Sequence, residues 1–382
     1  MKRALTYLAA LLGVYVAVEL ASFAVLAGVS LLHPGGFAPS IDEILTGLEQ
    51  EDLTEYLASD YHPLLGWDNK PGSTSTEKNC MGEPWTESFD ADGARSSPLD
   101  FDSTLIASYG DSYVKGGEVN DDQTWQSQLS VDIGQGVKNY AVGAYCTYQA
   151  LLKARMHIAE GRTYPVTVLG INEQNIKRVV NLFRPFLYRT VSARLSFKPG
   201  LGCSGHQCVA VANLLSPDIR SIDEVRAIAL QAQKRDYWAR YRPVFEFPWS
   251  LNLLKLVRVV FDHFTEQERE PLWHKPEGIA AMHLIVAEFR QTVLDAGSLP
   301  VLLFIPHSAK EGSQPSYLEF KQAVAREYPD LLVLDVSETQ FDRKKFRLKP
   351  ANCHPSEYGH SVIAKTVRDG LAHAQSMQTL QQ

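Results

Sequence analysis

The sequence has no surplus of positive charge and no long basic run. Its 382 residues include 37 lysines and arginines against 44 aspartates and glutamates, which gives a formal net charge of −7. Binding a polyanion needs a basic surface, so this balance argues against nucleic acid as a partner. The chain also lacks paired histidines at helical spacing, so neither a metal nor a cofactor is expected.

Cysteine is scarce, and only five are present: Cys80, Cys146, Cys203, Cys208 and Cys353. Cys203 and Cys208 bracket a loop short enough to close with a local disulfide, and we expect that pair. Zinc is the alternative, with His206 between the two thiols, but a second ligand pair at finger-like spacing is missing. At most one further pair can form. Cys146 with Cys353 is one candidate, and buried free thiols are the other outcome.

Charge is almost absent from the N-terminal segment. Two basic residues at positions 2–3 precede an apolar run, 5–32, whose one charge is Glu19. A bilayer span needs roughly 20 apolar residues, whereas the apolar core of a cleaved signal peptide has about 7–15. We therefore expect residues 1–36 to form an uncleaved transmembrane anchor, with a cleaved signal peptide as the competing interpretation. Glu19 is costly in lipid and would face a partner helix or be tolerated in a single span.

The basic residues before the run predict the orientation of this anchor. They favour a single pass through the cytoplasmic (inner) membrane with the N-terminus inside. The remaining chain would then lie on the extracytoplasmic, periplasmic face, where disulfides can persist.

The segment 37–100 is expected to connect the anchor to the main domain. Ser40 followed by Glu43 forms the pattern of a capping box, which predicts a short juxtamembrane helix. Residues 61–100 are rich in glycine, proline and serine, and Asp92-Gly93 is a hairpin turn signal. We expect an irregular β lead-in that packs on the main domain.

Residues 101–376 alternate short apolar strands with helical patterns. The expected strands are 104–109, 137–141, 165–170, 300–305 and 331–335, and the expected helices are 123–133, 146–160, 173–190, 276–297, 313–328 and 357–376. Such alternation predicts a parallel sheet with helices on both faces. The expected fold is a three-layer α/β/α sandwich with a five-stranded parallel sheet in flavodoxin-like order.

A helical insertion is expected at about 185–272. Within it, residues 222–241 have the pattern of a polar, arginine-rich helix. Residues 248–261 have apolar side chains on one face at helical spacing. The ordinary interpretation of 248–261 is a helix packed on the core. The alternative is a helix at the membrane surface or against a partner protein.

Polar residues stand where several of the expected strands end. They are Gly110-Asp111-Ser112 after the first strand, Gly143 after the second, Asn172-Glu173 after the third, and His354-Pro355 before the last helix. Ligands of such sheets bind outside the carboxyl ends of the strands, so these residues should converge. Each alone has an ordinary role as a turn or cap residue. Together, in this order, they resemble the SGNH (GDSL-type) hydrolase family over roughly 104–175 and 330–368.

The resemblance implies ester chemistry. Ser112 would be the nucleophile and His354 its base. The backbone N–H groups of Ser112 and Gly143 and the side-chain amide of Asn172 would hold the oxyanion of the tetrahedral intermediate.

The resemblance also implies supporting roles for Asp111, Asn139 and Glu173. Asn139 would tie its loop to the neighbouring strand, and Glu173 stands where the family commonly has an aspartate after the asparagine.

One feature departs from the family pattern. Members commonly have an aspartate two or three residues before the histidine, where it orients the imidazole, but Ala351 and Asn352 stand there. Three aspartates could replace it in space: Asp102, Asp335 and Asp342. Otherwise a Ser-His dyad, aided by a backbone carbonyl, or a weakened site is expected.

The leading hypothesis from the sequence is a membrane-anchored serine esterase that removes acyl, in particular acetyl, groups from an exported carbohydrate. The first alternative is a glycan O-acetyltransferase that uses the same residues. It would need an acyl donor, delivered by a multi-span membrane acyltransferase that contacts Glu19 or the helix 248–261. The second alternative is a non-catalytic glycan-binding module, which the missing acid before His354 supports.

Overall fold

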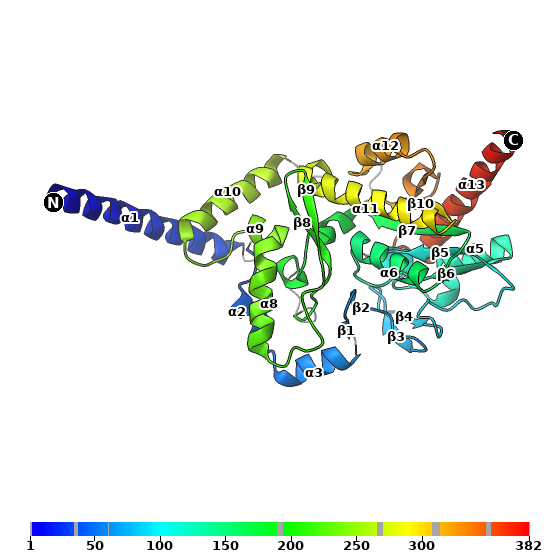
Figure 1. Cartoon of the computed structure of the whole chain (residues 1–382), viewed down its shortest axis with the longest axis horizontal. Helices are drawn as coiled ribbons and strands as arrows, with labels where there is room; N and C mark the ends of the chain where they lie inside the picture. The colour runs from blue at the N-terminus through cyan, green and yellow to red at the C-terminus, as the bar shows by residue number, and fades with distance from the viewer. Residues whose placement is uncertain are drawn as a thin grey trace.

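The structure is a computed structural model that describes residues 2–33, 37–59, 61–188, 194–265, 270–307, 314–348 and 353–381. Helix α1 (Lys2–Leu32) extends from one end of the molecule, and the central sheet lies toward the other end (Figure 1).

A five-stranded parallel sheet forms the centre of the main domain. Its strands are β5 (Thr104–Tyr109), β6 (Gly136–Asn139), β7 (Val166–Asn172), β10 (Leu299–Ile305) and β11 (Leu332–Asp335). Their spatial order is β11-β10-β7-β5-β6, and each neighbouring pair is parallel. Counted in chain order from the β6 edge, this arrangement is 2-1-3-4-5, which confirms the predicted flavodoxin-like order.

Helices cover both faces of this sheet. One layer contains α5 (Trp125–Ile133) and α13 (Glu357–Gln381), and the other contains α6 (Thr147–Ala159), α11 (Pro276–Asp295) and α12 (Leu318–Glu327). Alternate residues of β10 enter the two cores: Val301 and Leu303 pack with the α5–α13 layer, whereas Leu302 and Phe304 pack with the other. The fold is therefore the three-layer α/β/α sandwich that the sequence predicts.

The segment between α1 and the sheet contains short elements. They are α2 (Ile41–Leu45), α3 (Gln50–Ser59), β1 (Tyr61–His62), β2 (Gly66–Trp67), β3 (Thr74–Lys78) and β4 (Pro84–Ser88). The capping box of Ser40 and Glu43 is present at α2. β1–β2 and β3–β4 form two antiparallel ladders, and Gly93, at φ 74°, turns the chain between the bridged residues Phe89 and Arg95.

The region 173–241 differs from the expected helices. The helix expected at 173–190 is broken into short pieces, which are the α-helix α7 (Ile176–Val179) and the 3₁₀ helices Glu173–Asn175 and Arg184–Phe186; residues 189–190 lie outside the described part of the chain. A hairpin that the sequence did not predict follows, formed by β8 (Gly200–Ser204) and β9 (Gln207–Val211) and closed by the Cys203–Cys208 disulfide. The helix expected at 222–241 is divided into α8 (Ile222–Arg235) and α9 (Tyr237–Tyr241), because the Asp236 carboxylate caps α9.

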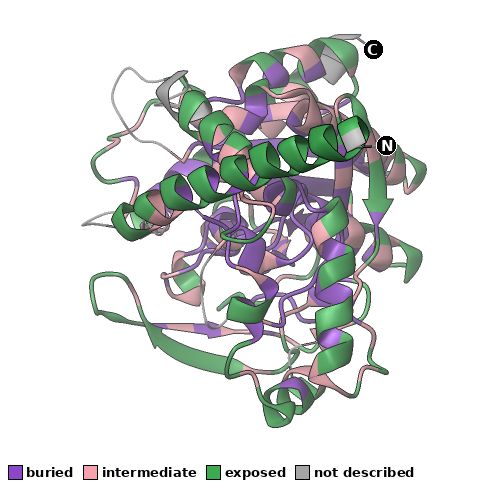
Figure 2. Cartoon of the chain, turned by 90° about the vertical axis from the view of Figure 1, so that its left-hand side faces the viewer, coloured by how far each residue is buried: buried purple, intermediate pink, exposed green. Residues whose placement is uncertain are grey.

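Helix α1 is long and apolar enough to cross a membrane, although a signal sequence would share these properties. Figure 2 shows it exposed along most of its length. The helix α10 (Trp249–Thr265) packs along α1, where Leu256 contacts the cluster of Leu26 and Phe37. The expectation that 248–261 packs on the core of the main domain is therefore wrong.

Glu19 has a partner in this helix pair. Its carboxylate accepts hydrogen bonds from the backbone N–H of Ser250, at 3.2 Å, and from the Ser250 hydroxyl. The opposite face of α10 is apolar and exposed, at Leu251, Leu254, Val257 and Phe261. The one charge of the apolar run thus contacts a neighbouring helix of the same chain.

Candidate active site

Ser112 lies just beyond the carboxyl end of the central strand β5, as the first residue of the short helix α4 (Ser112–Lys115). The preceding turn requires a glycine at Gly110, because a Cβ there would lie 2.3 Å from Val114 Cγ2. The Asp111 carboxylate caps α4 and accepts a hydrogen bond from the backbone N–H of Tyr113 at 3.0 Å. The turn therefore holds the Ser112 side chain outside the sheet.

His354 reaches Ser112 from the loop before α13. The distance from His354 Nε2 to Ser112 Oγ is 2.8 Å, and that from His354 Nδ1 to Glu118 Oε2 is also 2.8 Å. A carboxylate accepts hydrogen bonds, so Nδ1 carries the proton and Nε2 is left to accept one from the serine. Ser112, His354 and Glu118 thus have the geometry of a serine triad.

Glu118 is the orienting acid that the sequence analysis missed. The prediction that Asp102, Asp335 or Asp342 plays this role is wrong. Asp335 instead pairs with Lys321 at 2.7 Å, and Asp342 accepts a hydrogen bond from the backbone N–H of Lys344. A dyad without an acid is also wrong, because Glu118 bonds His354 directly.

The Glu118 carboxylate is held by more than the imidazole. Its Oε2 also accepts the backbone N–H of His354 at 2.9 Å, and its Oε1 accepts the backbone N–H of Cys80 at 2.9 Å. The hydrogen bond from the His354 side chain lowers the pKa of Glu118, and these backbone donors add to that effect against the opposing effect of burial. Glu118 has φ 68°, in the left-handed region that favours glycine, as found at functional sites.

Arg95 fixes the loop that carries Glu118. Its side chain is almost fully buried, with the whole residue 4% exposed, and it donates to three backbone carbonyls and one carboxylate of the segment 115–121. These acceptors are Lys115 O at 3.0 Å, Gly116 O, Val119 O at 2.5 Å and Asp121 Oδ1 at 2.7 Å. The lead-in before the sheet therefore builds part of the site.

A disulfide joins the same region to the histidine loop. Cys80 and Cys353 are bonded, so the residue that donates to Glu118 is linked covalently to the residue before His354. The suggested pairing of Cys146 with Cys353 is wrong; Cys146 is a buried free thiol that caps α6. The side-chain atoms of Cys80, Glu118 and Cys353 lie within 4.8 Å of one another, but disulfide sulfurs lack the thiolate charge that binds a metal.

Opening the Cys80–Cys353 disulfide should reduce turnover as well as stability. In the double variant Cys80→Ser/Cys353→Ser we expect kcat to fall about 10- to 100-fold, because the Glu118–His354 pair loses its alignment with Ser112. We expect a stability loss of about 2–5 kcal/mol. The matched control, Cys203→Ser/Cys208→Ser, opens the β8–β9 hairpin and should change the melting temperature more than kcat. Equal losses of kcat in both double variants would contradict a positioning role.

Asn172 supplies a free hydrogen-bond donor at the end of β7. Its Oδ1 accepts the backbone N–H of Gln174 at 3.0 Å, which orients the amide. Its Nδ2 is buried and has no acceptor among the described residues. An unpaired buried donor costs about 1–3 kcal/mol, so such a group is well suited to an acceptor that is present only during reaction.

Two backbone N–H groups accompany the Asn172 amide. Ser112 is the first residue of α4, where an N–H has no acceptor within its helix. Gly143 follows β6, and its carbonyl accepts the Trp67 indole N–H at 3.0 Å, which fixes the loop at this residue. β6, β5 and β7 are neighbours in the sheet, so these donors come from adjoining strand ends. The set can stabilise an oxyanion.

Replacing Asn172 by alanine tests this donor set. We expect kcat to fall about 10²- to 10³-fold, because one oxyanion donor is lost. The free energy of unfolding should fall by no more than about 1 kcal/mol, because loss of the cap on Gln174 is offset by removal of the unpaired buried donor. Enzyme kinetics and a thermal melt on the same sample separate the two effects. An unchanged kcat would remove Asn172 from the site.

The three residues expected to support the site, Asp111, Asn139 and Glu173, make hydrogen bonds next to it. Asn139 Nδ2 donates to Lys115 O at 2.9 Å, which ties β6 to the end of α4. Glu173 accepts the backbone N–H groups of Ser316 at 2.6 Å and His307 at 3.1 Å. Burial raises the pKa of Asp111, and the nearby Arg178 opposes that shift.

A second histidine, absent from the sequence analysis, lies near the serine. His307 Nδ1 is 3.0 Å from the Tyr113 hydroxyl, and Arg347 donates to that hydroxyl at 2.7 Å. Burial lowers the pKa of His307 to about 4, and Arg347 adds to the shift, so its ring is neutral at pH 7. Arg347 also donates to Cys353 O at 2.7 Å, so it braces the loop that carries His354.

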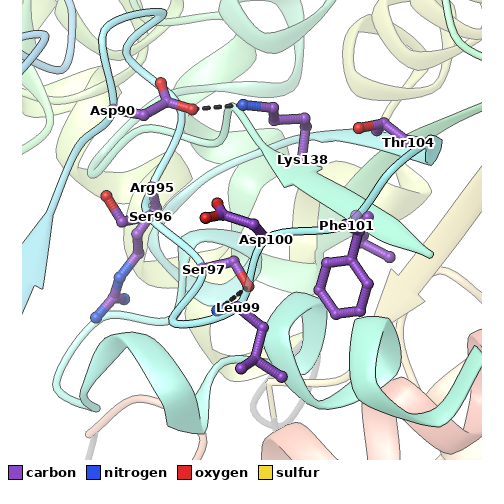
Figure 3. A pocket seen from close by; sticks show the side chains of 11 residues that line it. Asp90, Arg95, Ser96, Ser97, Leu99, Asp100, Phe101, Thr104 and Lys138 are labelled. Atoms are coloured by element: carbon purple, nitrogen blue, oxygen red, sulfur yellow. Dashed lines mark hydrogen bonds and ion pairs between the residues drawn. The ribbon is translucent and has the colours of Figure 1, made fainter. Parts of the chain in front are cut away.

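A separate pocket of about 300 Å³ lies at the amino-terminal ends of β5 and β6 (Figure 3), whereas Ser112 follows the carboxyl end of β5. It is lined by Ser97, Asp100 and Phe101, and by an ion pair between Asp90 and Lys138 at 2.5 Å. The triad residues are not among its lining residues. This pocket is therefore distinct from the candidate active site.

Comparison with known proteins gives remote structural likenesses. No family model and no curated protein matches the chain. One similar solved structure is described as a lipolytic protein of the G-D-S-L family from Desulfitobacterium hafniense DCB-2, with 13% identity, a TM-score of 0.36, and coverage of 70% of this chain and 99% of that one.

Two further solved structures are similar at the same level. The first is the salicylyl-acyltransferase SsfX3 of a tetracycline biosynthetic pathway, with 11% identity, a TM-score of 0.35, and coverage of 72% of this chain and 57% of that one. The second is a carbohydrate esterase family 2 enzyme with a carbohydrate-binding domain from Myceliophthora fergusii, with 11% identity, a TM-score of 0.35, and coverage of 77% and 72%.

Proposed function

We propose that this protein is a membrane-anchored serine esterase that removes acyl, in particular acetyl, groups from an exported carbohydrate. The observation that carries the proposal is the continuous relay from Ser112 Oγ through His354 to Glu118, with both contacts at 2.8 Å. The free amide of Asn172 beside this relay supports the same chemistry. The preference for a carbohydrate rests on the resemblance of the four sequence blocks to the SGNH family.

The reaction begins with attack of Ser112 Oγ on the carbonyl carbon of the ester. His354 Nε2 takes the serine proton, and the ionised Glu118 stabilises the imidazolium that forms. The carbonyl oxygen becomes an oxyanion, which the N–H groups of Ser112 and Gly143 and the amide of Asn172 can hold. Collapse of the intermediate breaks the bond to the sugar oxygen, which takes a proton from His354 and leaves as a hydroxyl. The acyl group stays on Ser112.

The second half repeats these steps with a new nucleophile. His354 removes a proton from water, and the resulting attack on the acyl-serine releases the carboxylic acid and restores Ser112. If a glycan hydroxyl replaces water, the acyl group is transferred. The exposed apolar face of α10 beside α1 is the observation that favours the O-acetyltransferase alternative, because a multi-span membrane partner could deliver acyl groups there.

The proposed location is the extracytoplasmic face of the cytoplasmic membrane, with α1 as an uncleaved single-pass anchor and the N-terminus inside. Two disulfides support an exported domain, since such bonds persist in oxidising compartments. The packing of α10 along α1, with Glu19 bonded to Ser250, supports retention of α1 in the mature protein.

The test uses the full chain in detergent micelles with an O-acetylated oligosaccharide and an unacetylated acceptor. Released acetate is measured enzymatically, and acceptor mass is followed by mass spectrometry. Acetate release that exceeds transfer supports the esterase. Transfer that exceeds release supports the O-acetyltransferase, and neither activity in folded protein would leave the glycan-binding alternative.

A further inference from the structure

An arginine without a carboxylate partner lies beside the candidate active site. Arg184 is in a short 3₁₀ turn, and its guanidinium carbon is 5.6 Å from the ring centroid of Trp67 and 5.9 Å from that of Tyr188. Its Nε is buried without a hydrogen-bond acceptor, and no acid pairs with it in the part of the chain that the structure describes. The guanidinium is half-buried, and a buried donor without an acceptor is costly, which favours a site for an absent anion.

Arg184 is connected to the catalytic turn through its neighbours. Trp67, which lies against its guanidinium, donates its indole N–H to Gly143 O in the oxyanion loop. On the other side, Tyr188 receives a long hydrogen bond from Arg178 Nε at 3.5 Å. The anion site would therefore adjoin the oxyanion donors.

Arg178 brings a second guanidinium to this place. Its Nη1 is 3.4 Å from Asp111 Oδ2 and donates to Tyr145 O at 3.2 Å. Asp111 is the residue before Ser112, and its other oxygen caps α4. Asp111, already engaged in a cap, is thus the carboxylate that pairs with Arg178, and no such pair is shown for Arg184 among the described residues. The charge of Arg178 also adds to burial in lowering the pKa of Arg184.

We propose that Arg184, together with Arg178, binds a carboxylate of an acidic carbohydrate substrate beside Ser112. A guanidinium presents parallel N–H donors that match the two oxygens of a carboxylate, and it is more weakly hydrated than an ammonium group. A uronic acid residue next to the acylated sugar would place its carboxylate in this position. The inference rests on the proposed function and names the substrate class: acylated glycans that contain uronic acid.

The test compares two acetylated substrates, one acidic and one neutral. The full chain in detergent is assayed with an acetylated galacturonate oligosaccharide and with an acetylated neutral xylo-oligosaccharide, and the ratio of their kcat/KM values is taken. In Arg184→Gln we expect this ratio to fall about 10- to 100-fold, because a charged hydrogen bond to the acidic substrate is lost. Arg368→Gln, an exposed arginine of α13 paired with Asp132, is the matched control and should keep the wild-type ratio.

Three further measurements test the anion site, and one of them, calorimetry, does not depend on turnover. In the unmodified protein, added salt should lower the preference for the acidic substrate, because it screens the ion pair. Calorimetry with unacetylated trigalacturonate should show weaker binding to Arg184→Gln than to Arg368→Gln. An acetylated oligosaccharide that carries sulfate in place of carboxylate distinguishes a carboxylate site from a general anion site.

The outcomes separate the two proposals. If acetate is released from both substrates with equal kcat/KM and Arg184→Gln leaves the ratio and the trigalacturonate affinity unchanged, the acidic subsite is wrong and the esterase stands. If no ester is cleaved but trigalacturonate still binds through Arg184, the subsite stands and the esterase is wrong. A preference for the sulfated substrate over the uronate would overturn the carboxylate assignment.

Discussion

Glu118→Gln should lower kcat about 10⁴-fold, the size of the effect when the orienting acid of a serine triad becomes an amide. The amide can present an N–H to His354 Nδ1 and thereby favour the wrong imidazole tautomer, with the proton on Nε2. That nitrogen then cannot accept the proton of Ser112. The assay is hydrolysis of 4-nitrophenyl acetate by the full chain in detergent, with the melting temperature measured on the same protein.

Glu77→Gln is the matched control, because Glu77 is an exposed carboxylate on β3. It should keep the wild-type kcat. If Glu118→Gln lowers kcat by less than about 10-fold, the histidine would be working without its acid, as a dyad, and the triad would be wrong.

The pH dependence of the Glu118–His354 contact has a defined sign. The pKa of Glu118 is lowered, so its stabilising contact with His354 is complete above the ordinary glutamate pKa and is lost as the pH falls through the lowered value.

Ser112→Ala should show the largest loss, about 10⁴- to 10⁶-fold in kcat, because no other group can form the acyl intermediate. His354→Ala should show a loss of similar size. The double variant should be no worse than either single variant, because the two residues act as one unit. The described side-chain contact of the Ser112 hydroxyl is His354, so the alanine variant should remain folded.

Ser97→Ala is the control for this second prediction. Ser97 lines the pocket at the amino-terminal ends of β5 and β6 and is not part of the triad (Figure 3). Its replacement should leave kcat at the wild-type value. If Ser97→Ala were inactive and Ser112→Ala active, the catalytic centre would lie in that pocket instead.

The central sheet could be predicted from the sequence because buried parallel strands read as short apolar runs. Each of the five expected strands lies within two residues of the observed one. The β8–β9 hairpin could not be recognised, because both strands are short, β8 contains Gly200 and Gly202, and β9 is an apolar run without alternation. The break between α8 and α9 depends on Asp236, whose carboxylate also accepts the Asn181 amide from far along the chain.

Part of the site could be predicted for the same reason. Ser112 and Gly143 follow strands and Asn172 ends one, so local sequence indicates that they meet at one edge of the sheet. Glu118 has no such signal, because it lies in a turn and meets His354 across 236 residues. Its position depends on contacts from Arg95 and Cys80, in a segment that the sequence marks only as an irregular lead-in.

Labelling by a fluorophosphonate tests the central claim, that Ser112 is an activated nucleophile, most directly. The full chain is incubated with the reagent, its intact mass is measured, and the adduct is located by peptide mass spectrometry. We predict one adduct on Ser112, and none on His354→Ala under the same conditions, because the hydroxyl needs the base to react. Folded wild-type protein that stays unlabelled, or an adduct on any other residue, would contradict the account.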